Sequence, residues 1–366
     1  MTERFAQVDV RRLVPRLFVG ALVVFALLYV IVIASPPPEV GGNWRTTTFG
    51  SAFDDWQSFT RTLLNGLTFA GLLFIVASGF SLIFGLMRVV NMAHGSFYLL
   101  GGYIAYEVQQ NMTGERGYSI QGFDVNTWEW VFPALVAASA IGVVGLIVQQ
   151  VFLRWNQGQE LRQALITIAI SVIIADQVIA HFNEGLASSV TWPGWTNRLV
   201  ELPLLGIDYS LARLVVLFLG VAVGFSLWLW LYRTRTGMVI RAGVDDQQMT
   251  SALGVNIQLT FAIAFVVGSA LAAFGGVVGA SQGTVAPGQD GQWLLNSLVV
   301  VIIGGMGSLL GAAAGSLLYG LVFSFAAVYL PTTGDNCCTQ YSIVFTFILL
   351  ALVLAFRPQG LFGKFS

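Results

Sequence analysis

Charge is scarce in this sequence, and its scarcity decides the broad class of the protein. Of its 366 residues, 10% are charged and 56% are hydrophobic, and the mean hydropathy is +0.78. Because soluble proteins carry about 25% charged residues, these values exclude a soluble enzyme and a disordered scaffold. We therefore expect an integral membrane protein.

Lysine, histidine and cysteine are nearly absent, which removes most sites of chemistry. The one lysine is Lys364, so the chain lacks the G-x-x-x-x-G-K-S/T loop with which nucleotide-binding proteins hold phosphates. The two histidines are isolated, and the adjacent Cys337 and Cys338 offer no spacing that suits a metal ion. The sequence predicts no catalytic residue, no metal or other cofactor, and no nucleic-acid partner for this chain.

The cysteine pair also excludes a disulfide framework. Adjacent Cα atoms lie about 3.8 Å apart, which is closer than the Cα separation of an ordinary disulfide. We expect Cys337 and Cys338 to be inert thiols, and a strained bond between them is the alternative.

Long apolar runs, by contrast, are abundant. Charges, prolines and polar clusters separate them, and most approach the roughly 20 residues that a spanning helix needs. The sequence predicts an all-α polytopic membrane protein with about ten transmembrane segments, at residues 17–34, 63–86, 91–109, 131–152, 163–182, 209–231, 257–281, 293–304, 307–330 and 341–356.

The arginines indicate how these segments are oriented. If the N-terminus is cytoplasmic, twelve of the seventeen cations fall on the cytoplasmic side, as the positive-inside rule requires. Both termini are then cytoplasmic, because an even number of crossings returns the chain to its first side. Tryptophans such as Trp128, Trp192 and Trp195 fall on the opposite side, as expected of an interfacial aromatic belt.

Two of the ten segments are unusual. The first, 17–34, follows a basic stretch and is either a retained helix or a cleaved signal peptide. The eighth, 293–304, is too short to cross unaided and runs into Gly304-Gly305-Met306-Gly307-Ser308. We expect a half-helix with a glycine turn at membrane depth, where protein or water must cover the exposed backbone.

A short internal sequence repeat bears on the predicted topology. Leu67-Thr68-Phe69-Ala70 opens the second segment and Leu259-Thr260-Phe261-Ala262 opens the seventh, which runs in the opposite direction. An inverted repeat of five plus five helices, a common transporter plan, would produce this pattern. Chance would also produce a match of four residues.

Few polar residues lie inside the apolar runs, and they are candidates for a translocation pathway. Asp176 is the acid well inside a segment, so it either faces a cavity or bonds to a neighbouring helix. Asn91 and His94 lie three residues apart, on one face of a helix, and either brace a helix junction or line a cavity.

The longest cytoplasmic loop, 232–256, alternates charged and apolar residues and predicts a short amphipathic helix over 241–254. Arg241, Asp245 and Asp246 would form its polar frame, and Val244, Met249 and Leu253 its apolar anchors, with Gly254 as the C-terminal cap. A lipid-bound helix usually has a face rich in lysine and arginine. This mixed charge therefore favours a protein groove over the lipid surface as the partner.

Several motifs in this chain occur together in one known family. They are Asn65-Gly66-Leu67-Thr68, Gly79, Gly85, Asn91-Met92-Ala93-His94-Gly95, Met249, Ala252-Leu253-Gly254-Val255-Asn256, Gly304-Gly305-Met306-Gly307-Ser308 with Gly311, and Arg357-Pro358-Gln359-Gly360-Leu361-Phe362-Gly363. Over about residues 61–364 the sequence thereby resembles the first of the two permeases of the branched-chain amino acid ABC importer family.

The resemblance implies partners that the composition does not reveal. In that family a second permease, two ATP-binding-cassette ATPases and an extracytoplasmic binding protein complete the importer, and the ATPases bind ATP and Mg²⁺. The helix at 241–254 would be the coupling helix that docks into an ATPase. The resemblance also implies a multi-pass location in a bacterial-type plasma (inner) membrane, with residues 61–366 as the permease domain.

Two departures from the family qualify this reading. Family members usually carry an acid after the Asn-x-Ala-His-Gly run, where this chain has Ser96, and many begin near residue 60. Residues 1–60 are therefore expected to be an added N-terminal helix and extracytoplasmic loop. We expect a permease for branched-chain or similar small amino acids, whose translocation pathway includes Asn91, His94, Ser96, Asp176, Gly304, Gly305, Gly307 and Ser308. Alternatives are a permease for urea or short amides and an ion-coupled secondary transporter.

Overall fold

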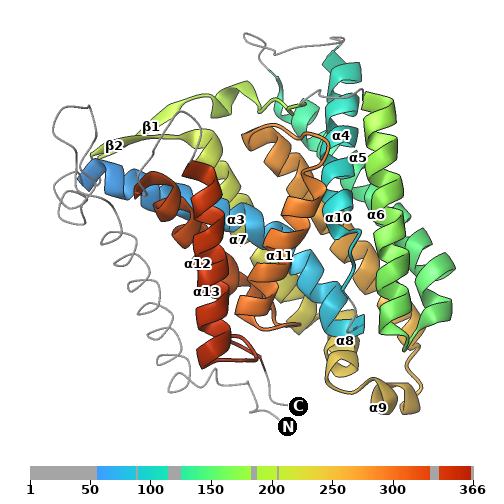
Figure 1. Cartoon of the computed structure of the whole chain (residues 1–366). Coiled ribbons are helices and arrows are strands. Elements are labelled where there is room, and N and C mark those ends of the chain that lie inside the picture. The colour runs from blue at the N-terminus through green and yellow to red at the C-terminus, as the bar shows by residue number, and fades with distance from the viewer. Residues whose placement is uncertain are drawn as a thin grey trace.

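The computed structural model describes residues 56–87, 90–113, 125–182, 188–203, 206–329 and 338–363. The predicted helix at 17–34, most of the predicted addition 1–60, and Cys337 lie outside these residues. Within them the chain is a bundle of helices with one small hairpin (Figure 1). The helices are α3 (Trp56–Met87), α4 (His94–Thr113), α5 (Thr127–Ile147), α6 (Glu160–Phe182), α7 (Leu211–Arg233), α8 (Arg235–Asp245), α9 (Gln247–Ala252), α10 (Ile257–Gln282), α11 (Asp290–Gly304), α12 (Leu309–Tyr329) and α13 (Cys338–Phe356).

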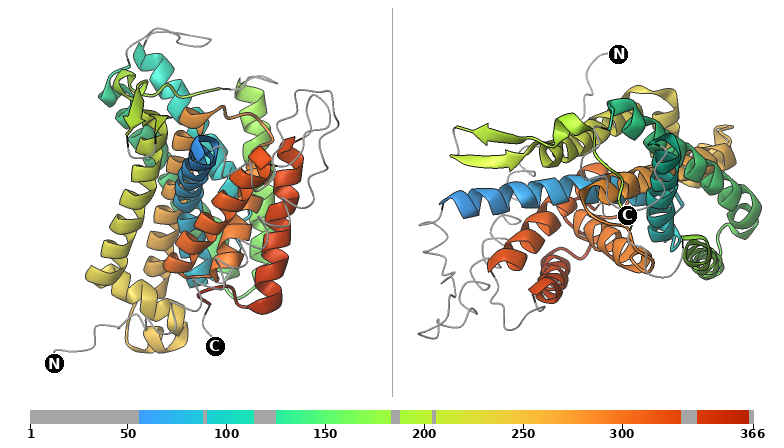
Figure 2. Two further views of the ribbon diagram at one scale, coloured as in Figure 1. Left: turned by 90° about the vertical axis from the view of Figure 1, so that its left-hand side faces the viewer. Right: turned by 90° about the horizontal axis from the view of Figure 1, so that it is seen from above.

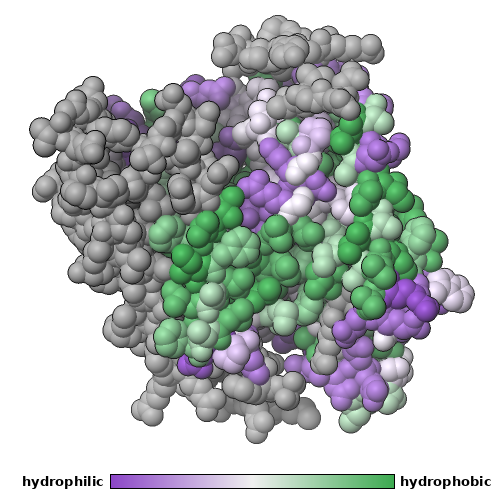
Figure 3. Space-filling view, in the orientation of Figure 1, coloured by the Kyte–Doolittle hydropathy of each residue, from purple (hydrophilic) through white to green (hydrophobic). Residues whose placement is uncertain are grey.

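Each apolar run predicted from residue 63 onward overlaps one of these helices. Among the described residues, six helical stretches are long and apolar enough to cross a membrane. On the face drawn in Figure 3, hydrophobic residues accordingly form a band across the middle, with polar residues toward both ends. The count of ten crossings stays a prediction. The six stretches are Trp56–Met87, Thr127–Asn156, Glu160–Phe182, Leu211–Arg233, Ile257–Gln282 and Leu309–Val328.

The two ends of the bundle carry different structures (Figure 2). One end, here called the hairpin end, holds strands β1 (Leu199–Leu202) and β2 (Ile207–Ser210), which pair antiparallel with Leu199 opposite Ser210. This hairpin is a departure from the predicted all-α fold. The other end, here called the α9 end, holds α8 and α9 and the turn between α11 and α12. In the predicted orientation the α9 end is cytoplasmic.

Small residues bring the central helices close together. The row Gly268, Ala272, Gly276 and Ala280 of α10 is buried inside the chain. A Cβ atom at Gly268 would collide with the Gly79 carbonyl of α3, and one at Gly276 would collide with the Tyr98 carbonyl of α4. This row therefore packs helices within one subunit, since small residues let helix backbones approach closely in lipid. The proposed inverted repeat stays a prediction.

Candidate functional site

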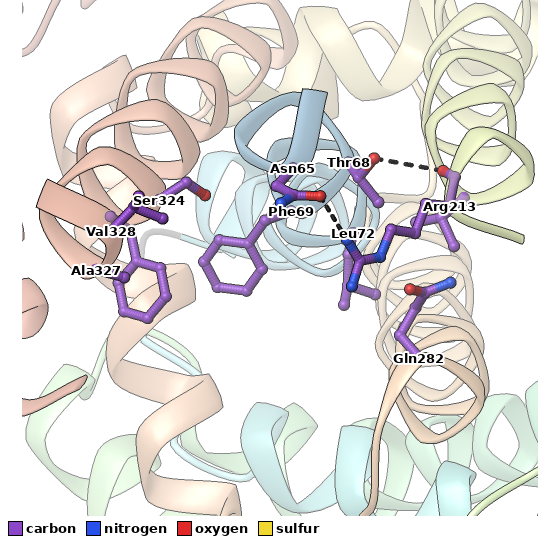
Figure 4. A pocket seen from close by; sticks show the side chains of 11 residues that line it. Asn65, Thr68, Phe69, Leu72, Arg213, Gln282, Ser324, Ala327 and Val328 are labelled. Carbon is purple, nitrogen blue, oxygen red and sulfur yellow. Dashed lines mark hydrogen bonds between the residues drawn. The ribbon is translucent and has the colours of Figure 1, made fainter. Parts of the chain in front are cut away.

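A cavity of about 320 Å³ opens at the hairpin end, between α3, α7, α10 and α12 (Figure 4). Its walls combine six apolar side chains with five polar ones. Among the eleven lining residues there is one cation and no acid. The lining residues are Asn65, Thr68, Phe69, Leu72, Arg213, Val216, Gln282, Phe323, Ser324, Ala327 and Val328.

A hydrogen-bonded network holds the polar wall of the cavity in place. Arg213 donates from its guanidinium to Asn65 Oδ1 over 2.6 Å, and the Tyr209 hydroxyl donates to the same oxygen over 3.1 Å. Tyr209 also bonds to the Thr68 hydroxyl at 3.0 Å. Burial raises the pKa of the Tyr209 phenol above its ordinary value, so the phenol keeps its proton at neutral pH and remains a donor.

This arrangement suits a small molecule with a carboxylate and an apolar body. A guanidinium has five N–H donors, and the contact with Asn65 uses one, so Arg213 retains donors for a carboxylate. Phe69, Leu72 and Val216 supply an apolar wall. The sequence prediction missed this site, although Asn65 and Thr68, three residues apart in an apolar helix, were a signal.

Two predicted pathway residues, Asn91 and His94, brace a helix junction. His94 is fully buried, and its Nε2 lies 3.0 Å from the Val76 carbonyl of α3. Asn91 Oδ1 accepts a hydrogen bond from the Ala93 amide over 3.1 Å, just before α4 begins. Neither residue lines the cavity. The geometry favours the bracing role over the pathway role.

Ser96 lies in a second polar cluster, where the resemblance implies an acid. Its hydroxyl donates to Asp290 Oδ2 of α11 over 3.3 Å and lies 2.7 Å from the Ser171 hydroxyl of α6. Asp176, the acid that the sequence placed in the pathway, is instead exposed on the surface of α6. Helical spacing alone could not reveal this, because the packing partner of each α6 face is set by the tertiary fold.

The glycine turn predicted at residues 304–308 is present at the end of α11. Gly305 and Gly307 have φ angles of 101° and 79°, in the left-handed region that glycine adopts readily. A Cβ atom at Gly304 would collide with the carbonyl of Gly311, so α11 and α12 cross there in close contact. The Ser308 hydroxyl accepts from the Gly311 amide over 3.0 Å and caps the start of α12.

The C-terminal motif completes this turn. The amides of Leu361 and Phe362 donate to the carbonyls of Ile303 and Gly304, each over 2.9 Å. The last carbonyls of a helix have no partner within the helix, so the C-terminal segment satisfies two of them. This contact joins the two glycine-rich motifs in the fold.

The predicted helix over 241–254 is two helices, and the single-helix prediction is wrong. Asp246 is extended (φ −152°, ψ 107°), and its Oδ1 accepts a hydrogen bond from the Met249 amide over 2.9 Å. An aspartate that caps a new helix in this way interrupts the preceding one. Gly254 follows α9 with a φ angle of 82°, so its predicted capping position is confirmed.

The predicted anchors of this segment differ in exposure. Met249 and Leu253 are 61% and 76% exposed. Val244, however, packs inside the chain against the cluster of Leu86, Phe261 and Ala264, so it is not an outward anchor.

One residue of the predicted polar frame, Arg241, also contacts another part of the chain. The Arg241 guanidinium lies 4.4 Å from the centre of the Tyr232 ring, while Asp245 and Asp246 are exposed. The predicted docking surface is therefore reduced to α9 and its flanks.

The chain is similar in sequence to known transport proteins. A family model described as "Branched-chain amino acid transport system / permease component" matches residues 62–354. The chain is 30% identical to the high-affinity branched-chain amino acid transport system permease protein BraD of Pseudomonas aeruginosa, over 84% of this chain and 96% of that protein. It is 27% identical to the corresponding permease protein LivH of Escherichia coli, with 84% and 96% covered.

The solved structures give a more distant likeness. An inward-facing ABC transporter of the metal-chelate type is 15% identical, covering 93% of this chain and 98% of that one, with a TM-score of 0.47.

Proposed function

Because this chain belongs to the family of permease components of branched-chain amino acid transport systems, we propose that it is the membrane-spanning subunit of an ATP-driven importer for branched-chain or similar small amino acids. The chain provides the route through a bacterial-type plasma membrane. A second permease, two ATPases that bind ATP and Mg²⁺, and an extracytoplasmic binding protein complete the importer. Residues 61–366 form the permease domain, and 1–60 are an addition to it.

The observation that carries this proposal is the exposed pair Met249 and Leu253 at the α9 end. Docking of a helix into a groove depends on a few apolar anchors. The described part of the chain leaves both side chains largely uncovered, so a partner protein can bury them. The α8–α9 segment is also joined to the bundle, because Gln247 Nε2 donates to the Leu86 carbonyl at the end of α3. A movement of the docked ATPase would therefore be transmitted to α3.

The cavity supports the choice of substrate. A branched-chain amino acid has a carboxylate for Arg213 and an aliphatic body for Phe69, Leu72 and Val216. Urea and short amides have no carboxylate for Arg213, so the cavity favours an amino acid over these alternatives. Family membership likewise favours an ATP-driven importer over an ion-coupled transporter.

The test is transport by the complex isolated through an affinity tag on this chain. Reconstituted in vesicles with its binding protein, the complex should take up leucine, isoleucine or valine when ATP is supplied on the α9 side, and ATPase subunits should co-purify with it. Uptake of urea or acetamide in place of these amino acids would support the amide alternative. Uptake that needs an ion gradient and no ATP would overturn the proposal.

A further inference from the structure

Asp290 lies at the mid-depth of the bundle. It contacts Ser96, which lies 2.7 Å from Ser171, and Ser171 is the middle residue of the spanning helix α6 (Glu160–Phe182). The length of α11 also keeps Asp290 inside the core. Its 15 residues end at the glycine turn of the α9 end, and they span only about 22 Å of a hydrocarbon core about 30 Å thick, so α11 does not reach the opposite face.

The position of Asp290 is fixed by three elements. α4 packs against both α6 and α11, and a Cβ atom at Gly95 of α4 would collide with the Asp290 carbonyl, which leaves no room between the two helices. The Ser96 hydroxyl can donate to Asp290 Oδ2 over 3.3 Å or to the Ser171 carbonyl over 3.5 Å, and either hydroxyl can be the donor between Ser96 and Ser171. Asp290 is also in the first turn of α11, where the helix dipole favours a carboxylate.

The start of α11 around Asp290 is partly open. Asp290 is half-buried, while Gly291 and Gln292 are exposed beside it. An acid held at mid-depth cannot reach the aqueous surface, and such residues face water-filled pathways or protein in membrane proteins. Asp176 differs, because it is six residues from the end of α6 and exposed on the outer surface.

We propose that Asp290 is a mid-membrane binding residue for the ammonium group of the transported amino acid, and that Ser96 and Ser171 orient its carboxylate. The identity of the ligand rests on the proposed function. The site is separate from the cavity at the hairpin end, whose lining residues include no acid. One site thus provides a cation for the carboxylate of the substrate, and the other provides an acid for its ammonium group.

Transport by the complete complex in vesicles tests the ligand. Asp290→Asn should lower leucine uptake by about tenfold or more, since a hydrogen bond to a charged group is lost, while the ATPase subunits still co-purify. Asp290→Glu should restore part of the uptake because it keeps the charge. Asp176→Asn, the matched control on α6, should transport normally. Uptake at the wild-type rate by Asp290→Asn would overturn the proposal.

Thiol labelling tests whether the site meets water, and it does not depend on the substrate. In a chain with Cys337→Ser and Cys338→Ser, Ser171→Cys is nearly isosteric and should react with a water-soluble methanethiosulfonate about tenfold faster than Val172→Cys, whose side chain is 63% exposed on the apolar surface of α6. Leucine with its binding protein and ATP should slow the reaction of Ser171→Cys.

The two assays distinguish failure of the proposed function from failure of the binding role of Asp290. Should the wild-type complex take up urea instead of leucine, the proposed function fails and labelling still reports whether the site meets water. Should Ser171→Cys react no faster than Val172→Cys in any state, the site is closed to water and the binding role of Asp290 is wrong even if leucine is transported.

Discussion

Gly85 of α3 and Gly307 of the turn between α11 and α12 meet backbone against backbone. A Cβ atom at Gly85 would lie 2.7 Å from the Gly307 Cα, and one at Gly307 would lie 2.9 Å from the Gly85 Cα. The end of α3 also accepts the hydrogen bond from Gln247 of α9. The glycine turn and the docking segment therefore share one support, and a change at either is expected to reach the other through α3.

Substitution of Gly307 tests this contact. In Gly307→Leu, the left-handed backbone costs about 1–2 kcal/mol and overpacking against Gly85 about 1–3 kcal/mol more. We expect a lower unfolding temperature of the detergent-solubilised protein and little or no assembled complex. Gly283→Leu is the control, because its Cβ meets no atom within 4 Å. Equal stability of the two variants would show that the turn is open.

Docking of the ATPase is tested by the two exposed anchors. Truncating an anchor typically costs about 2 kcal/mol, roughly a thirtyfold loss of affinity. Met249→Ala combined with Leu253→Ala should therefore reduce co-purification of the ATPase subunits and the ATPase activity stimulated by loaded binding protein, with membrane insertion unchanged. Met112→Ala, an exposed methionine near the end of α4, should change neither quantity. If the double variant keeps normal co-purification of the ATPase subunits and normal stimulated ATPase activity, α9 lies on lipid and does not dock into an ATPase.

The cap at Asp246 gives a finer test of the same segment. Replacing a capping aspartate with alanine costs about 1 kcal/mol, because the Met249 amide loses its acceptor. Asp246→Ala should weaken stimulated ATPase activity, and Asp246→Asn, which retains a capping oxygen, should resemble the wild type. Asp246→Arg should weaken it further through misplaced charge. Equal loss in the Asn and Ala variants would instead implicate the charge of Asp246.

Substitution of Arg213, the one cation among the lining residues, tests whether the cavity binds the substrate. Arg213→Gln removes the charge offered to a carboxylate, and loss of a charge-assisted hydrogen bond of about 1.5–3 kcal/mol should reduce leucine uptake about tenfold or more. Arg198→Gln is the control, since Arg198 is exposed at the same end and does not line the cavity. Normal uptake by Arg213→Gln would mean that the cavity does not contact the substrate.

The orientation of the bundle is tested by labelling single cysteines from each side. Gly194→Cys, at the hairpin end, should react with an impermeant thiol reagent in intact cells, and Gln157→Cys should react only after the membrane is opened. Gln157 exchanges hydrogen bonds of 2.9 and 2.7 Å with Gln258 at the start of α10, so it belongs to the α9 end. The reverse pattern would invert the predicted topology.

The sequence determined the membrane class, the positions of the helices and the glycine turn, because apolar length and glycine backbone freedom are local properties. It also located Gly254 correctly, since a left-handed residue after a helix has a local sequence signal. The break at Asp246 could not be anticipated from the pattern. An aspartate on a polar helix face and an aspartate that caps a new helix have the same periodicity.

Tertiary structure alone decided which polar residues meet. Asp176 lies inside an apolar run, yet packing leaves it on the surface, whereas Asp290 at the edge of a short segment is brought to Ser96 and Ser171. Arg213 and Asn65 are 148 residues apart and form one wall of the cavity. Such pairs depend on which helix faces pack together, and that is set by the summed contacts of small residues across the whole bundle rather than by any single segment.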